Sequence, residues 1–389
     1  MSSPFAIIVG AGVTGLSAAW WLNRAGWRTM IVERAPDLRD GGYMLGLSGP
    51  GYETAGRMGL TPALEKVSYK INENVYRDRR GRELLRLRYR DFLKDLPYLA
   101  IRRNDLIMVL DAAVGSDTER RFGTSVETID PGGDKASVTL SDGSTLVADL
   151  VIGADGFRST TRRLVFGVDD SQFEHLGYRF AVFDIDDTLK LEADFLSFAE
   201  PGHLAEYYAL RGDRLAAMHV WRDRDAKAQP IEDRWGMLER VSATSHPMVR
   251  QFLKTGAHGE QPVIDSLTMV NMPSWSKGRF TLLGDAAHCL TLVSGQGAGM
   301  ALTSGEILAQ ELTKAPVLEA LAAHDRRLRP SITRLQQRSR KMAAIFIPET
   351  PFAFHTRNIV LRHMPRSWLG KYFANSIRSE IELVGDGNA

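Results

Sequence analysis

The chain has 389 residues, of which 44% are hydrophobic and 25% are charged, a composition typical of globular proteins. Its 49 basic and 47 acidic residues give a net charge of +2, which offers no argument for a nucleic-acid or strongly acidic partner. One cysteine, Cys289, excludes an intramolecular disulfide and a cysteine-rich metal site and favours a reducing cytoplasm. The first nine residues have no basic region and no long apolar stretch, so we expect no signal peptide. No apolar window is long enough for a transmembrane helix, so we expect no integral membrane association.

The first thirty-odd residues have the pattern of a β-α-β unit. Residues 5–9 are an apolar strand, and Gly10, Gly12 and Gly15 follow directly as Gly-x-Gly-x-x-Gly. Apolar residues then recur at helical spacing over 16–25, and residues 28–33 form the next strand, ending at Glu33. This length of chain predicts two domains, or one domain with a subdomain.

Each glycine has a physical reason to be there. Gly10 permits the tight turn, Gly12 lets a pyrophosphate approach the backbone, and Gly15 lets the helix pack against the strand. The helix N-terminus offers free N–H groups to phosphates, and Glu33 can accept hydrogen bonds from ribose hydroxyls. We therefore predict dinucleotide binding; the alternative is a glycine-rich turn beside a surface glutamate.

The rest of the chain separates into a strand-rich middle and a helical end. We predict a helix over 102–113, a hairpin over 138–147, a buried strand over 150–154, and repeated short strands between 177 and 223. These strands predict a mostly antiparallel sheet inserted into the nucleotide-binding domain. Residues 280–284 form a further buried strand, and from residue 300 the chain is helical, with breaks expected at Pro330, Pro348 and Pro365.

Two later segments extend the first motif. Asp155-Gly156-Phe157-Arg158-Ser159 follows a strand, and Gly284-Asp285-Ala286-Ala287-His288 follows another and leads to Gly295-Gln296-Gly297-Ala298-Gly299. In this combination the sequence resembles the single-component (group A) FAD-dependent aromatic hydroxylases of the para-hydroxybenzoate hydroxylase type, from residue 5 to about residue 312. Its length and helical end are also similar to the tetracycline-inactivating monooxygenases.

The resemblance implies an α/β fold. It consists of a Rossmann-like FAD-binding domain, an inserted, mostly antiparallel β-sheet substrate domain and a C-terminal helical segment. The expected ranges are 1–175 and 276–330 for the FAD-binding domain, 176–275 for the substrate domain and 331–389 for the helical segment.

The resemblance also implies roles for single residues. Asp285 would bind the FAD ribityl hydroxyls, Arg103 the ribityl–pyrophosphate region and Val126 the adenine, with Asp155 and Gly156 near the pyrophosphate and NADPH. Asp155 could instead cap the next helix. The full expected FAD set is Gly10, Gly12, Val13, Thr14, Gly15, Glu33, Arg34, Arg39, Met44, Arg103, Val126, Asp155, Gly156, Asp285, Gly295, Gln296, Gly297, Ala298 and Gly299.

The segment 295–299 has a rationale of its own. Consecutive N–H groups at a glycine-rich helix start form a positive site that would stabilise the anionic edge of reduced flavin. Three features depart from the family pattern: Leu290 and Leu292 replace prolines, Gly299 replaces asparagine, and Ser304 stands near a common aspartate. They put in doubt the shape of the pocket on the substrate side of the ring.

The resemblance implies that NADPH or NADH reduces FAD, that O2 adds, and that a flavin hydroperoxide passes one oxygen atom to an aromatic, phenolic or polyketide-like substrate, including a tetracycline-like one. The chain lacks a second Gly-x-Gly-x-x-Gly after a strand, so the nicotinamide is expected to bind transiently. Residues 215, 217, 219 and 221 alternate onto one face of the predicted sheet. The substrate candidates are Phe183, His203, Tyr207, His219 and Trp221, each of which could equally be a core residue.

Two alternatives to a monooxygenase stay open, and so does the oligomeric state. A reductase or saturase on the same scaffold would transfer hydride without oxygen, and a non-catalytic flavoprotein would not turn over NADPH. The chain could be a monomer or a homodimer. We expect His288 to be structural rather than a catalytic base, because it belongs to a motif that packs under the flavin.

Overall fold

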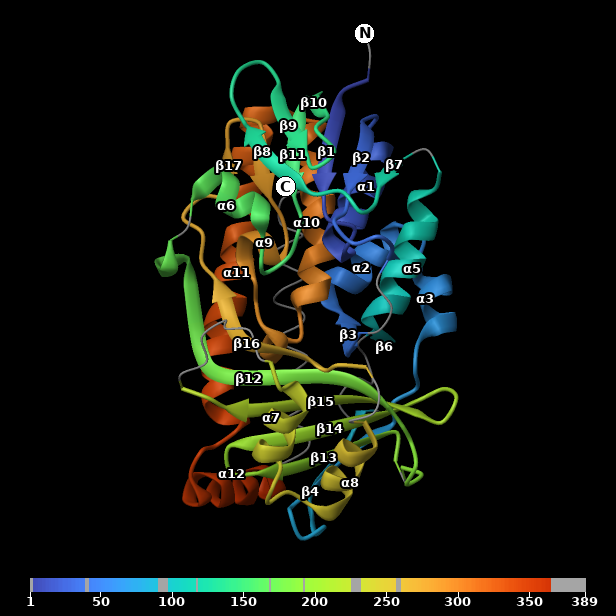
Figure 1. The fold of residues 1–389 in the computed structure, drawn as a ribbon, viewed down its shortest axis with the longest axis vertical. Helices are drawn as coiled ribbons and strands as arrows, with labels where there is room; N and C mark the ends of the chain where they lie inside the picture. The colour runs from blue at the N-terminus through green and yellow to red at the C-terminus, as the bar shows by residue number, and fades with distance from the viewer. Residues whose placement is uncertain are drawn as a thin grey trace.

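The computed structural model describes residues 3–38, 42–89, 97–116, 118–167, 169–191, 193–224, 232–256 and 260–364. The expected FAD contact Arg39 and the expected break at Pro365 lie outside these residues. Figure 1 shows a nucleotide-binding half above a second sheet, with α11 running beside both.

The upper half is built on a six-stranded sheet of order β17-β18-β11-β1-β2-β7. Its strands are β1 (Phe5–Val9), β2 (Arg28–Val32), β7 (Glu119–Arg121), β11 (Leu150–Gly153), β17 (Ser276–Lys277) and β18 (Phe280–Leu282). β1 pairs in parallel with β2 and β11, and β18 pairs in parallel with β11. The predicted β-α-β unit and the return of the chain near residue 280 are therefore confirmed.

Helices cover one face of this sheet and a small second sheet covers the other. The helices are α1 (Val13–Arg24), α5 (Arg103–Val114) and α10 (Gly297–Leu312). On the opposite face lie α6 (Thr160–Phe166) and the antiparallel strands β8 (Val126–Asp130), β9 (Ala136–Leu140) and β10 (Thr145–Ala148). The pairing of β9 with β10 is the expected hairpin.

The lower half is a seven-stranded sheet of order β16-β12-β15-β14-β13-β4-β5. Its strands are β4 (Glu73–Arg77), β5 (Glu83–Arg88), β12 (Phe173–Asp186), β13 (Phe195–Glu200), β14 (His203–Leu210), β15 (Arg214–Arg222) and β16 (Val263–Val270). The antiparallel pairings of β12 to β15 confirm the predicted sheet. Strands β4 and β5 were not predicted: they come from an earlier part of the chain, and β4 joins β13 in parallel.

The two faces of the lower sheet have different covers. Helices α7 (Arg234–Val241) and α8 (Pro247–Gly256) bury one face, through Trp235 and Phe252. The other face packs on the C-terminal helices and on Leu292 of the short η2 (Leu292–Ser294). Between the halves, β3 (Met44–Ser48) and β6 (Tyr98–Arg102) form a ribbon that leads into α2 (Gly49–Arg57) and α3 (Thr61–Val67).

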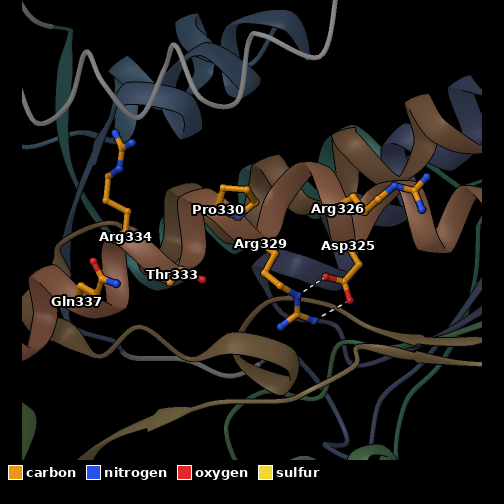
Figure 2. Close-up of a pocket in the computed structure, with 7 residues that line it drawn as sticks. All are labelled: Asp325, Arg326, Arg329, Pro330, Thr333, Arg334 and Gln337. Atoms are coloured by element: carbon orange, nitrogen blue, oxygen red, sulfur yellow. Dashed lines mark hydrogen bonds and ion pairs between the residues drawn. The ribbon is translucent and has the colours of Figure 1, made fainter.

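The C-terminal helices are α11 (Val317–Phe346) and α12 (Pro351–His363). The expected break at Pro330 is wrong, because α11 continues through it. Pro330 lies on the exposed side, near Arg326 and Arg334 in Figure 2. The Arg326 carbonyl that loses its helical partner can therefore reach water. The break at Pro348 is confirmed. Within the described ranges, no helix is both long and apolar enough to cross a membrane.

Candidate cofactor site

A cavity opens at the carboxyl ends of β1, β2 and β11, where parallel α/β sheets place nucleotide ligands. Eight of the expected FAD contacts line it: Gly10, Gly12, Glu33, Arg34, Arg103, Val126, Asp155 and Gly156. Sequence reasoning missed other lining residues, among them Ala35, Leu38, Ile107, Thr124 and Ser125. They follow strands or lie inside α5 without a motif to mark them.

The three glycines of the first motif have the packing that their spacing predicts. Gly10 has a φ of +111°, and a Cβ there would lie 2.5 Å from the carbonyl oxygen of Ala154. A Cβ on Gly15 would lie 1.9 Å from the carbonyl oxygen of Gly10. Gly12 instead faces open space, where a Cβ would have the Arg103 guanidinium as its nearest neighbour, at 3.8 Å. The floor of the cavity is therefore bare backbone beside the start of α1, as a pyrophosphate requires.

Glu33 is held at the edge of this floor. Its Oε2 accepts the Ala11 N–H at 2.9 Å, and its Oε1 accepts the Ala35 N–H at 2.9 Å. The carboxylate thus has a fixed orientation while it still lines the cavity. Each oxygen keeps a second lone pair, which suits the hydroxyls of a ribose.

Asp155 takes the capping role that the sequence left open as its alternative. Its carboxylate accepts the N–H groups of Thr160 and Thr161 at 2.8 and 2.9 Å, at the start of α6. Further along α6, Arg162 donates to the carbonyls of Phe157 and Ala286, both at 2.8 Å. These bonds tie the Asp155 motif to the Gly284 motif, and so shape the cavity wall.

Asp285 and Arg103 come together beside Tyr43. Asp285 begins α9 (Asp285–His288), after Gly284, whose missing Cβ leaves room for Thr14. The Asp285 side chain is solvent-accessible, yet it sits in a recess whose protein walls raise the pKa of its carboxyl, while Arg103 opposes that shift. Burial raises the pKa of Tyr43 to about 12. An accessible carboxylate and a cation in one recess fit the ribityl hydroxyls and the pyrophosphate of FAD.

The segment 295–299 forms the uncapped start of α10. Gly295 has a φ of +66°, and Gln296 is the N-cap without a capping side-chain bond to any described residue. Gln296 donates its Nε2 to Ser48 Oγ at 3.2 Å, which ties this turn to the end of β3. The first N–H groups of a sixteen-residue helix therefore remain available to an anion. Met44 lies at the other end of β3, and Val13 lies in the first turn of α1.

The departures from the family pattern differ in their surroundings. A Cβ on Gly299 would lie 3.4 Å from Gly51 Cα, an ordinary contact, so close packing does not explain the absence of asparagine there. Leu290 and Leu292 pack into the two cores on either side of the turn. Ser304 is buried and lies 3.2 Å from His324 Nε2.

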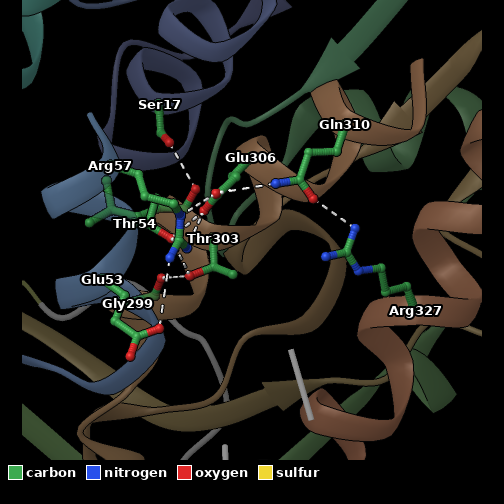
Figure 3. Close-up of polar contacts among 10 residues, drawn as sticks. Ser17, Glu53, Thr54, Arg57, Gly299, Thr303, Glu306, Gln310 and Arg327 are labelled. Atoms are coloured by element: carbon green, nitrogen blue, oxygen red, sulfur yellow. Dashed lines mark hydrogen bonds and ion pairs between the residues drawn. The ribbon is translucent and has the colours of Figure 1, made fainter. Parts of the chain in front are cut away.

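An ion pair between a buried glutamate and a half-exposed arginine holds α10 in place (Figure 3). Glu306 of α10 is 2% exposed and accepts Arg57 Nη2 at 2.7 Å and Thr54 Oγ1 at 2.6 Å, both from α2. Ser17 of α1 donates to the Leu302 carbonyl at 2.8 Å. Sequence reasoning missed this network, because no motif links residues about 250 positions apart.

The structure brings the five substrate candidates together on the side of the lower sheet that α7 and α8 cover. Tyr207 OH lies 2.9 Å from His219 Nε2, and His203 Nε2 lies 3.3 Å from His219 Nδ1. Phe183 stacks edge-on against Trp235, and Trp221 belongs to the same core. All five are buried, on the face opposite to that which meets Leu292. The alternation was read correctly, but the sequence did not show which face the helices take.

His288 has the environment of a structural residue. It is 3% exposed and packs against Trp275, with ring centroids 4.9 Å apart. Burial lowers its pKa to about 3, and His324 contributes in the same direction. A neutral imidazole enclosed in this way is poorly placed to exchange protons with a substrate.

Comparisons with known proteins agree with this geometry. Residues 5–328 match the sequence family described as FAD binding domain. An uncharacterised Mycobacterium tuberculosis protein is 32% identical, over 79% of this chain and 85% of its own. A flavin-dependent monooxygenase of Legionella longbeachae is 28% identical, over 79% of each.

Solved structures share the fold. Tetracycline destructase Tet(55) superposes with a TM-score of 0.83 at 23% identity, covering 97% of both chains. Klebsiella pneumoniae HpxO, complexed with FAD and uric acid, superposes with a TM-score of 0.82 at 21% identity, also covering 97% of both chains.

Proposed function

Because the chain belongs to the FAD binding domain family of flavin-dependent monooxygenases, we propose that it transfers one oxygen atom from O2 to an aromatic, phenolic or polyketide-like molecule. NADPH or NADH would be the reductant. FAD, when bound, supplies the activation of O2 and the transfer of oxygen.

One observation carries the proposal: two anion-binding turns begin helices that pack against each other, α1 and α10. The turn at Gly10 to Gly12 with Glu33 would suit the adenosine pyrophosphate, and the uncapped start of α10 would suit the far end of the same cofactor. Arg103 lies beside Gly12 and also interacts with the Asp285 carboxyl. A nicotinamide dinucleotide alone would not need the second turn.

The protein's own contribution is to bind, orient and shield. Glu33 and Arg103 would hold the cofactor, and the first N–H groups of α10 would stabilise negative charge on the ring. The lower sheet would form the roof over the reacting atoms and exclude water from them.

The test is NADPH consumption in air by the FAD-loaded protein, with a panel of phenols, polyketides including tetracycline, and purines. We expect a substrate-stimulated rate and a product heavier by one oxygen atom. A product that gains two hydrogens, at a rate unchanged without oxygen, would instead establish a reductase. Measuring these rates again with NADH in place of NADPH identifies the reductant.

A pair of variants tests the cofactor site itself. Glu33→Gln should weaken FAD binding about tenfold, because it removes the charged acceptor of the ribose hydroxyls. Glu65→Gln, on the exposed side of α3, is the control and should bind FAD as the wild type does. FAD affinity is measured from flavin fluorescence quenching. Equal affinity in both variants would contradict the assignment of Glu33.

A further inference from the structure

A polar cluster lies on the face of the lower sheet opposite to α7 and α8. We name Glu206, Ser197, Asn74, Tyr76 and Tyr208 the Glu206 cluster. Ser197 of β13 lies directly beside Glu206 of β14 on one side and beside Tyr76 of β4 on the other. In the same way, Phe195 separates Asn74 from Tyr208. Residues opposite one another in a sheet share a face, so the five side chains project from one side.

This face packs on Leu292, which precedes the 295–299 turn of the expected cofactor site. Tyr98 of β6 lies close enough to Tyr208 of the cluster for their hydroxyls to interact electrostatically. Tyr98 pairs in register with Ser48, and Ser48 is the residue that holds Gln296 at the start of α10. The Glu206 cluster and the expected ring position are therefore joined through a short chain of contacts.

Glu206 is enclosed and poorly satisfied. It is 4% exposed, and no ion pair reaches it from the described residues. Ser197 Oγ lies 3.2 Å from Glu206 Oε1 and 2.9 Å from Asn74 Oδ1, so its single proton is shared between two acceptors. Asn74 is fully buried, and its Nδ2 makes no well-formed hydrogen bond in the described ranges, although its side chain lies close enough to the Tyr89 hydroxyl to oppose the rise in the pKa of Tyr89. Buried polar groups of this kind normally have partners, and a ligand can supply them.

The surrounding groups are proton donors rather than cations. The tyrosine rings at positions 76, 89, 98 and 208 are partly exposed, while burial raises the pKa of each hydroxyl. Glu206 raises the pKa of three of them further: Tyr76, Tyr89 and Tyr208. Arg357 of α12 is the nearby cation, and it acts on Tyr76. Burial raises the pKa of Glu206 itself to about 7.

We infer that Glu206 is the proton acceptor for an ionisable hydroxyl, phenolic or enolic, of the substrate. This rests on the proposed function. The substrate O–H bond breaks as a proton passes to a Glu206 carboxylate oxygen, and the electron pair stays on the substrate oxygen. That pair makes the adjacent carbon more nucleophilic toward the electrophilic oxygen that the flavin site delivers. Tyr76 and Tyr208 donate to the oxygen that becomes negative.

The first experiment measures binding, because binding does not depend on turnover. para-Nitrophenol is titrated into the FAD-loaded chain at pH values from about 6 to 8, and its ionisation is read from difference absorbance. Glu206→Gln should weaken binding about tenfold or more. The methyl ether, para-nitroanisole, has no proton to give, so its affinity should not change between wild type and variant.

Glu200→Gln is the matched control. Glu200 lies on the neighbouring strand but bonds His203 and Ser245 on the helix-covered face. It should bind para-nitrophenol as the wild type does. Wild-type binding that is absent, or that Glu206→Gln leaves unchanged, would overturn the inference.

The second experiment uses oxygen-dependent NADPH consumption with a phenol that stimulates it. The wild-type rate should rise through an inflection near neutral pH, and Glu206→Gln should lose this inflection and most of the stimulation. An unchanged profile in Glu206→Gln would refute the role of Glu206. A wild type that consumes no NADPH with any compound would instead count against the proposed function, and para-nitrophenol binding would still test the inference.

Discussion

The ion pair between buried Glu306 and half-exposed Arg57 offers a direct test of how α10 is positioned. Arg57→Leu leaves the Glu306 carboxylate, 2% exposed, with only neutral partners such as Thr54 among the described residues. Breaking a fully buried pair costs about 3–5 kcal/mol, but the Arg57 side chain is 46% exposed and solvent screens part of the interaction. We therefore expect a loss of about 2 kcal/mol in the free energy of unfolding.

The assay is thermal unfolding of the FAD-loaded chain, followed by the release of flavin fluorescence. With an unfolding entropy of about 2.1 cal/mol/K per residue, 389 residues convert 2 kcal/mol into a fall in Tm of roughly 2–3 °C. Arg57→Leu combined with Glu306→Leu removes both charges and should recover most of this loss. Arg224→Leu breaks an exposed pair with Glu349 and serves as the control with no measurable change. A double variant less stable than Arg57→Leu would refute the reasoning.

Three further predictions follow from close packing and from buried histidines. Gly15→Ala places a Cβ 1.9 Å from the Gly10 carbonyl oxygen. It should lower the free energy of unfolding by more than about 2 kcal/mol, and the variant should lose FAD during gel filtration. A variant that stays saturated with FAD would contradict this. Tyr207→Phe leaves His219 Nε2 buried without its 2.9 Å partner and should lower the free energy of unfolding by about 1–3 kcal/mol, measured by thermal unfolding. Burial gives His288 a folded-state pKa of about 3, below its unfolded value near 6.5. Its contribution to the free energy of unfolding is therefore complete above about pH 6.5 and falls by about 1.4 kcal/mol per pH unit below it. His288→Asn should flatten the fall of Tm between about pH 6.5 and 5, and equal slopes for variant and wild type would count against this role.

The motifs could be read from sequence because their chemistry is local. One strand-helix unit contains Gly10, Gly12 and Gly15, and Glu33 directly follows the next strand. Each has a backbone reason that does not depend on distant residues. For Asp155 this reasoning succeeds only in part. Its position was predicted, but its hydrogen bonds go to α6 rather than to the open cavity.

The parts that could not be read depend on contacts between distant segments. β4 and β5 contain Glu73, Glu83 and three arginines in eleven strand residues, so they lack the apolar pattern of buried strands. Their place beside β13 is fixed by a parallel pairing between residues more than 120 positions apart. The continuation of α11 through Pro330 has the same origin, since buried residues of α11 before and after Pro330 hold the helix against the core.

The proposed position of the substrate site depends on a shift of one residue along β14. His203, Ala205 and Tyr207 lie on the face that α7 and α8 cover, whereas Leu204, Glu206 and Tyr208 lie on the face that packs on Leu292. Periodicity alone marks two faces and assigns function to neither. The helices distinguish the faces, because Trp235 and Phe252 pack against the one that they cover. In the proposed function that face stabilises the sheet and the opposite face meets the substrate, which is why Tyr207→Phe should change the melting temperature and Glu206→Gln the binding of a phenol.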